Sequence, residues 1–260
     1  METGTPMLRS ILILALLGAC TAPPPVQTAP VAEPLPHQWH TIGESVEGRP
    51  IQVATFGTGS RRVYVIGGIH GDERPGLENV DRLRELLRVD GFLGDTTVRL
   101  LRDVNPDGSE HRTRTNANGV DLNRNFPAQN FRPSDGRGPA PLCEPETQAL
   151  AADLEAFDPD IVIVFHAARR GPFVNFNGPG RLLAERFARA AYDAVGDWRV
   201  VPDMGYATPG SLGSWLGDDR GLPVLTIEFG REQDPDVVWP GLEQALVKTL
   251  GPGAEDHLAR

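Results

Sequence analysis

The hydrophobic pattern of this chain alternates between two periods, which predicts strands that alternate with helices. Among the apolar stretches, residues 161–165 and 223–227 are apolar at almost every position. Such runs are typical of central strands covered on both faces. Between the stretches, apolar residues recur at the i, i+3, i+4 spacing of amphipathic helices. The expected strands are 51–56, 62–66, 97–101, 161–165 and 223–227, and the expected helices are 75–87, 146–157, 181–195 and 240–250.

This alternation of strands and helices indicates an α/β domain with three layers, α/β/α. The sequence contains no internal repeat, and no second linker interrupts its globular part. We therefore expect one folded domain over residues 39–260, a length that suits a single α/β domain.

The first residues have the features of a secretory signal peptide. Arg9 precedes an apolar run, residues 10–19, that is shorter than the roughly 20 residues a permanent membrane helix needs. The run ends in Leu-Gly-Ala-Cys, which resembles a bacterial lipobox, so we expect residues 1–19 to be a lipoprotein signal peptide and Cys20 to carry lipid. The alternative is an ordinary signal peptide in which the cysteine is incidental.

The segment after this cysteine is rich in proline, and we expect residues 20–38 to form an extended tether. A tether behind a lipid anchor would hold the domain away from the membrane. We therefore expect an exported lipoprotein at the periplasmic face, which contacts the membrane only through Cys20. The residue after it is Thr21 and not aspartate, which favours the outer membrane by analogy with other lipoproteins.

The net charge and the cysteine count argue against two further features, nucleic-acid binding and an intramolecular disulfide. A net charge of -10 disfavours nucleic acid as a partner, because phosphate binding needs a basic surface. Cys143 is the only cysteine besides Cys20, so a lipidated chain has no intramolecular disulfide.

Three of the predicted strands run directly into an ionisable residue: His70, His166 or Glu228. Ligand sites of open α/β sheets lie beyond the carboxyl ends of the strands, so these side chains can meet in one crevice. His70 and Glu73 form the pair in His-Gly-Asp-Glu, and His166 would complete the two-histidine, one-glutamate set of a catalytic zinc site. The alternative for each histidine is a hydrogen-bonded structural role. The remaining histidines, at positions 37, 40, 111 and 257, have no comparable partners.

Several short strings accompany these residues in a fixed order. They are G-E-S-V-E-G-R-P-I (43–51), G-G-I-H-G-D-E (67–73), N-P-D-G (105–108), R-T-N-A-N-G-V-D-L-N-R-N-F-P (114–127), E-P-E-T (144–147), F-H-A (165–167), T-P-G-S-L-G (208–213) and T-I-E (226–228). With this combination the chain resembles the zinc metallocarboxypeptidases of the carboxypeptidase A type, especially their murein peptide amidase branch, from about residue 42 to 250. The resemblance implies a mixed, mostly parallel central sheet and a catalytic domain that binds one Zn²⁺ ion.

The same resemblance implies that His70, Glu73 and His166 bind the zinc and that Glu228 is the general base. A zinc ion with three protein ligands lowers the pKa of its water to about 7. A carboxylate beside that water can take its proton and later deliver it to the leaving amine.

Further residues are implied to act on the substrate. Arg114 would stabilise the oxyanion, and Asn123 and Arg124 would bind the terminal carboxylate of the substrate, for which a planar guanidinium is well suited. Tyr206 is the candidate for a substrate-contacting tyrosine, although its offset from T-P-G-S-L-G differs by one residue from that in carboxypeptidase A. Outside these strings the two arginines would be interpreted as solvated loop residues.

Export and the resemblance together predict a peptidoglycan-derived peptide as substrate. The expected reaction is hydrolysis of the γ-D-glutamyl–diaminopimelate bond, as by a murein peptide amidase or D,L-carboxypeptidase. The alternatives are a general periplasmic zinc carboxypeptidase, a deacylase of the aspartoacylase or succinylglutamate desuccinylase kind, and an inactive wall-binding lipoprotein. The sequence departs from the amidase branch after Phe-His-Ala, where Arg169 and Arg170 either favour an acidic substrate or form a solvated loop.

Overall fold

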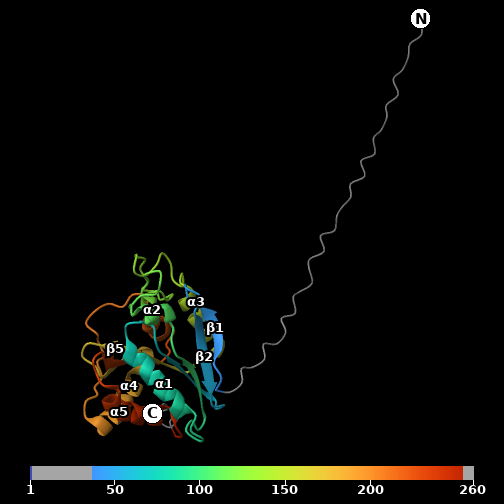
Figure 1. Cartoon of the computed structure of the whole chain (residues 1–260). Coiled ribbons are helices and arrows are strands. Elements are labelled where there is room, and N and C mark those ends of the chain that lie inside the picture. The colour runs from blue at the N-terminus through green and yellow to red at the C-terminus, as the bar shows by residue number, and fades with distance from the viewer. Residues whose placement is uncertain (2–36, 254–260) are drawn as a thin grey trace. The chain divides into compact units, whose positions relative to one another are not determined.

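A computed structural model of the chain describes Met1 and residues 37–253, which are organised around one sheet of seven strands (Figure 1). The strand order is β1-β2-β4-β3-β5-β7-β6. The central strands β4, β3, β5 and β7 run parallel, whereas the pairs β1–β2, β2–β4 and β6–β7 are antiparallel. The strands are β1 (His40–Glu44), β2 (Pro50–Phe56), β3 (Arg61–Ile66), β4 (Thr96–Leu101), β5 (Ile161–Ala168), β6 (Phe173–Asn177) and β7 (Val224–Gly230). The predicted α/β class is confirmed, with the parallel part of a mixed sheet at its centre.

Helices cover both faces of this sheet and complete the three layers. On one face, α1 (Arg74–Leu87), α4 (Arg181–Val195) and α5 (Pro235–Leu250) share a buried cluster with alternate residues of the strands. On the other face, α3 (Pro145–Phe157) and the π-helix Ser214–Asp219 pack against the intervening strand residues. Figure 1 shows α1, α4 and α5 grouped together and α3 beside β1. The short helix α2 (Pro106–His111) follows β4.

The structure differs from the sequence prediction mainly in the edge strands and in α5. The apolar pattern does not predict β1 or β6, because neither strand forms a continuous apolar run: β1 has no buried residue, and in β6 only Phe173 and Val174 are buried. The turn at residues 57–60 does not close a hairpin, since β4 lies between β2 and β3. Helix α5 begins ahead of the expected Pro240, because the Asp234 side chain caps it by accepting a hydrogen bond from the Asp236 N–H.

The predicted signal peptide, Cys20 and most of the proline-rich tether lie outside the described residues. The boundaries at residues 19 and 38 therefore stay predictions. Within residues 37–253, no helix combines the length and apolarity that a membrane span requires.

Strands β5 and β7 set the direction in which the site opens. Residues such as Phe165 and Ile227 pack on the side of α1, α4 and α5. Because successive side chains of a strand point to opposite faces, His166 and Glu228 point to the side of α3. These two residues are direct partners in the parallel register of β5 and β7. The register therefore places an imidazole and a carboxylate next to each other on one face of the sheet.

Candidate metal centre and active site

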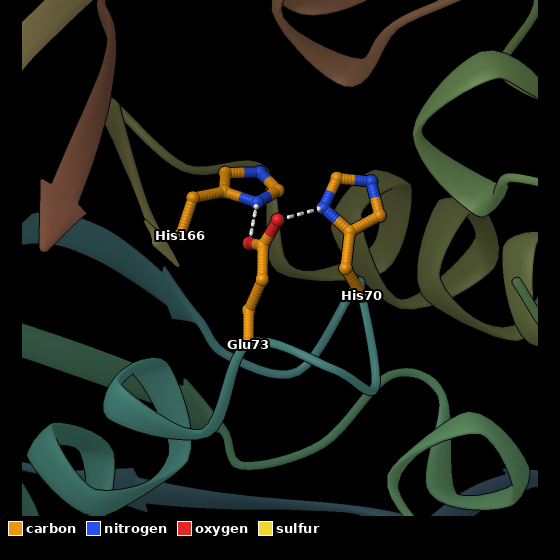
Figure 2. Close-up of side chains that lie close together, drawn as sticks. All are labelled: His70, Glu73 and His166. Carbon is orange, nitrogen blue, oxygen red and sulfur yellow. Dashed lines mark hydrogen bonds and ion pairs between the residues drawn. The ribbon is translucent and has the colours of Figure 1, made fainter. Parts of the chain in front are cut away.

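Two histidines and a glutamate form a buried cluster at the carboxyl ends of β3 and β5 (Figure 2). His70 lies in the loop after β3, Glu73 is the residue before α1, and His166 belongs to β5. The Nδ1 atoms of both histidines face Glu73: that of His70 lies 2.9 Å from Oε1, and that of His166 lies 2.9 Å from Oε2. The structure thus brings together the three residues predicted to bind metal.

The donor set of this cluster fits a zinc ion. The three ligand atoms lie within 4.8 Å of one another, and a tetrahedral zinc ion holds its nitrogen and oxygen donors about 3.4 Å apart. Asp121 supports the arrangement, since its Oδ1 lies 3.0 Å from Nε2 of His70. A carboxylate on the second ring nitrogen fixes the orientation of a metal-binding histidine and leaves Nδ1 for the metal.

The electrostatics of the cluster also favour a cation. Burial acts against ionisation of Glu73, but His166 and His70 outweigh it and hold the pKa of this carboxyl far below its usual range. Burial lowers the pKa of His70, whereas hydrogen bonds to Asp121 and Glu73 raise it above its usual value overall. The buried carboxylates therefore favour a positive charge on His70, and a metal ion satisfies that demand when it takes the place of the proton.

A close backbone approach explains the glycine between the first two cluster residues. A Cβ on Gly71 would collide with the backbone of Gly108 and Ser109 in α2. Only glycine lets the loop from His70 to Glu73 pass this near to α2. The His-Gly-Asp-Glu sequence therefore specifies both the donors and the tight path that joins them.

Glu228 faces the same space from β7. It is 9% exposed, and among the described residues its carboxylate has no hydrogen bond or ion pair. Burial raises its pKa above the usual value, even though His166 nearby acts in the opposite direction. A buried, unpaired carboxylate with a raised pKa is suited to accept a proton near neutral pH.

The remaining predicted residues line the same cavity, which has a volume of about 480 Å³. Arg114 donates from Nη1 to Oε1 of Glu73 at 3.1 Å and from Nε to Oδ2 of Asp121 at 3.1 Å. Asn123 accepts a hydrogen bond from the Leu212 N–H at 3.0 Å, and Nδ2 of this asparagine lies 3.4 Å from Nε2 of His166. The predicted metal, catalytic and substrate residues thus border one space.

Arg124 and Tyr206 complete the cavity wall. The guanidinium of Arg124 donates to the carbonyl oxygen of Asn123 at 2.6 Å, and burial lowers the pKa of this arginine. Gly210 has φ +70°, and a Cβ there would collide with the carbonyl oxygen of Arg124. Tyr206 is 59% exposed and borders the cavity, so its hydroxyl is accessible to a ligand.

Two residues of the site are missing from the sequence prediction. Asp121 lies within the G-V-D-L-N-R-N-F string, in which the sequence predicts a role only for Asn123 and Arg124. Arg231 comes three positions after Glu228 and donates to Asp72 at 2.8 Å and to Oε1 of Glu73 at 3.4 Å. Its position shortly after the predicted strand 223–227 is the only feature of the sequence that points to this arginine as a site residue.

Comparison with known proteins connects this geometry to one family. The pattern of the family described as zinc carboxypeptidase matches residues 32–222. Murein peptide amidase A of Escherichia coli is 33% identical over 215 residues, which cover 72% of this chain and 79% of that protein. Murein peptide amidase A of Vibrio campbellii is 30% identical over 206 residues, covering 73% of this chain and 78% of that protein.

A solved structure supports the same grouping. The crystal structure of murein-tripeptide amidase MpaA from Escherichia coli O157 superposes with a TM-score of 0.62 at 30% sequence identity. The superposition covers 83% of this chain and 92% of the other. The similarity therefore extends over most of both chains.

Proposed function

This chain belongs to the zinc carboxypeptidase family, and we propose that it hydrolyses the γ-D-glutamyl–diaminopimelate bond of peptidoglycan stem peptides. The observation that carries the hydrolytic chemistry is the His70–Glu73–His166 cluster, which shares one cavity with Glu228. The choice of substrate is supported by the similarity to murein peptide amidase A of Escherichia coli, at 33% identity over most of both chains.

Each side chain of the site has a separate task in this reaction. A zinc ion held by the cluster would polarise the scissile carbonyl and lower the pKa of the water beside it. Glu228 takes a proton from the attacking water on its carboxylate and passes it to the leaving amine. Arg114 donates to the oxyanion that develops on the carbonyl oxygen.

Asn123 and Arg124 hold the terminal carboxylate of the residue that leaves. A guanidinium binds a carboxylate through two parallel hydrogen bonds, which fixes both the position and the orientation of the peptide end. The diaminopimelate of a tripeptide stem has such a free carboxylate next to the scissile amide. Asn123 and Arg124, here called the carboxylate clamp, therefore fit a cleavage that releases one terminal, carboxylate-bearing residue.

The substrate assignment can be tested with two synthetic tripeptides. We expect the purified protein to release free diaminopimelate from L-alanyl-γ-D-glutamyl-diaminopimelate, measured by mass spectrometry of the products. A chelator should abolish the release, and added zinc should restore it. The control is the α-linked peptide L-alanyl-L-glutamyl-L-lysine. If that peptide is hydrolysed as fast as the stem peptide, the protein is a general carboxypeptidase and the peptidoglycan assignment is wrong.

We further propose that the enzyme acts as a lipoprotein at the periplasmic face of the outer membrane. The support is the Leu-Gly-Ala-Cys string that ends at Cys20 and the proline-rich segment behind it. Cells fed with a labelled fatty acid should incorporate label into the wild-type protein but not into a Cys20→Ala variant. Equal labelling of both proteins would contradict the anchor.

A further inference from the structure

Arg169 lines the active-site cavity but has no part in the chemistry described above. It follows β5 directly, is exposed, and among residues 37–253 makes no hydrogen bond or ion pair. The next residue, Arg170, is equally exposed but does not border the cavity. Of these two adjacent arginines, only Arg169 borders the active-site cavity.

The strand register gives the cavity an inner and an outer end. Thr226 lies two positions before Glu228 on the same face of β7, about 6.6 Å away. It pairs with Asn175 of β6, and both residues line the cavity. Arg231 lies three positions beyond Glu228, and its backbone N–H donates to the carbonyl oxygen of Ala168, beside Arg169. The base therefore lies between an inner end with Thr226 and an outer end with the two arginines.

The carboxylate clamp belongs to the inner end. The Asn123 side chain accepts a hydrogen bond from the Leu212 N–H. The next residue, Gly213, lies so close to the side chain of Asn177 in β6 that a Cβ there would collide with it. Asn177 borders the cavity on the side of Asn175, away from the outer arginines. A leaving residue held by this clamp occupies the inner end, so the acyl part of the substrate must extend past Glu228 towards the outer end.

The two arginines at the outer end, Arg169 and Arg231, are not equivalent. Arg231 is already engaged, since it donates to Asp72, to Glu73 and, at 3.3 Å, to the carbonyl oxygen of Ala167. Among the described residues, the Arg169 guanidinium has no hydrogen-bond or ion-pair partner, and this side chain borders the cavity. A guanidinium without a partner at this place is suited to bind an anion of the substrate.

We propose that Arg169 binds a carboxylate carried by the acyl-side residue of the substrate. This inference rests on the proposed function, because a γ-linked D-glutamyl residue keeps its α-carboxylate free on the acyl side of the scissile amide. An α-linked residue other than aspartate or glutamate offers no such group. Arg169 thereby makes the enzyme prefer stem peptides whose D-glutamate is unmodified over those in which it is amidated.

The test compares a carboxylate with its neutral isostere on the same peptide. The substrates are L-alanyl-γ-D-glutamyl-diaminopimelate and its D-isoglutaminyl analogue, in which the α-carboxylate is a carboxamide. For the wild-type enzyme we expect kcat/KM to be about tenfold higher with the carboxylate, as for a charged hydrogen bond partly exposed to water. Arg169→Gln should remove this preference by raising KM for the carboxylate peptide, with kcat and the zinc content unchanged.

Arg170→Gln is the matched control and should keep the wild-type preference, because its side chain does not reach the cavity. If wild type and Arg169→Gln give the same ratio between the two peptides, Arg169 is only a solvated loop residue and the inference is wrong. A second pair of substrates separates the role of Arg169 from the proposed function. These substrates are α-linked peptides with glutamate or glutamine on the acyl side of the scissile bond. If the enzyme hydrolyses only the α-linked peptides and not the stem peptides, the peptidoglycan assignment is wrong. The ratio of the rates with glutamate and with glutamine still tests the role of Arg169.

Discussion

The variant Glu228→Gln is expected to lower kcat by about 10²- to 10⁴-fold, the contribution typical of a positioned general base. The amide has the shape of the carboxylate but cannot accept a proton, so the attacking water is no longer activated. Zinc content should stay at the wild-type level, because Glu228 is not one of the three clustered donors. The measurement pairs stopped-time assays on the stem tripeptide with elemental analysis of the purified protein.

The matched control is Glu232→Gln, the same chemical change at an exposed residue four positions further along the chain. We expect it to leave both kcat and the zinc content unchanged. If Glu228→Gln turns over substrate at the wild-type rate, another group takes the proton and Glu228 has no catalytic role. A loss of zinc together with activity would instead make this residue part of the metal centre.

The central part of the fold could be predicted from the sequence because its strands are covered on both faces. The run from Ile161 to Phe165 is apolar at each position and forms the core of β5. The edge strands β1 and β6 could not be predicted in the same way, since pairing with one neighbour does not need continuous apolar side chains. Nor does local pattern determine strand order, which is why the insertion of β4 between β2 and β3 was not foreseen.

The site followed from a physical rule together with a resemblance. His166 and Glu228 come directly after the apolar runs of two predicted strands, which predicts that they meet at one edge of the sheet. The register of β5 and β7 confirms that they are neighbours. The loop residues Arg114, Asn123 and Arg124 have no periodic pattern, so only the resemblance identified them. The sequence does not predict Asp121 and Arg231 as site residues, because they act through contacts with His70 and Glu73 that no spacing in the sequence reveals.

Removal of one candidate metal donor, His166, should strongly lower both zinc affinity and hydrolysis. In His166→Ala we expect zinc affinity to fall by more than about 100-fold, since loss of a residue that merely orients a ligand already costs about 10- to 100-fold. His166 supplies Nδ1 to the cluster, and the two remaining donors cannot complete a catalytic zinc site. Hydrolysis should disappear with the metal, as measured by competition with a chromogenic chelator and by assays in excess zinc.

The experiment separates metal loss from misfolding by two further measurements. His111→Ala changes an exposed histidine that contacts Glu47 outside the cavity, and it should retain both zinc and activity. The urea midpoints of His166→Ala and of the chelator-treated wild type should both lie below that of the zinc-bound wild type, because both lack the stabilisation that metal binding provides, and a single cooperative transition shows that the variant is folded. A His166→Ala protein that still holds zinc with wild-type affinity would show that the histidine is structural, and the metal would then have to lie elsewhere in the cavity.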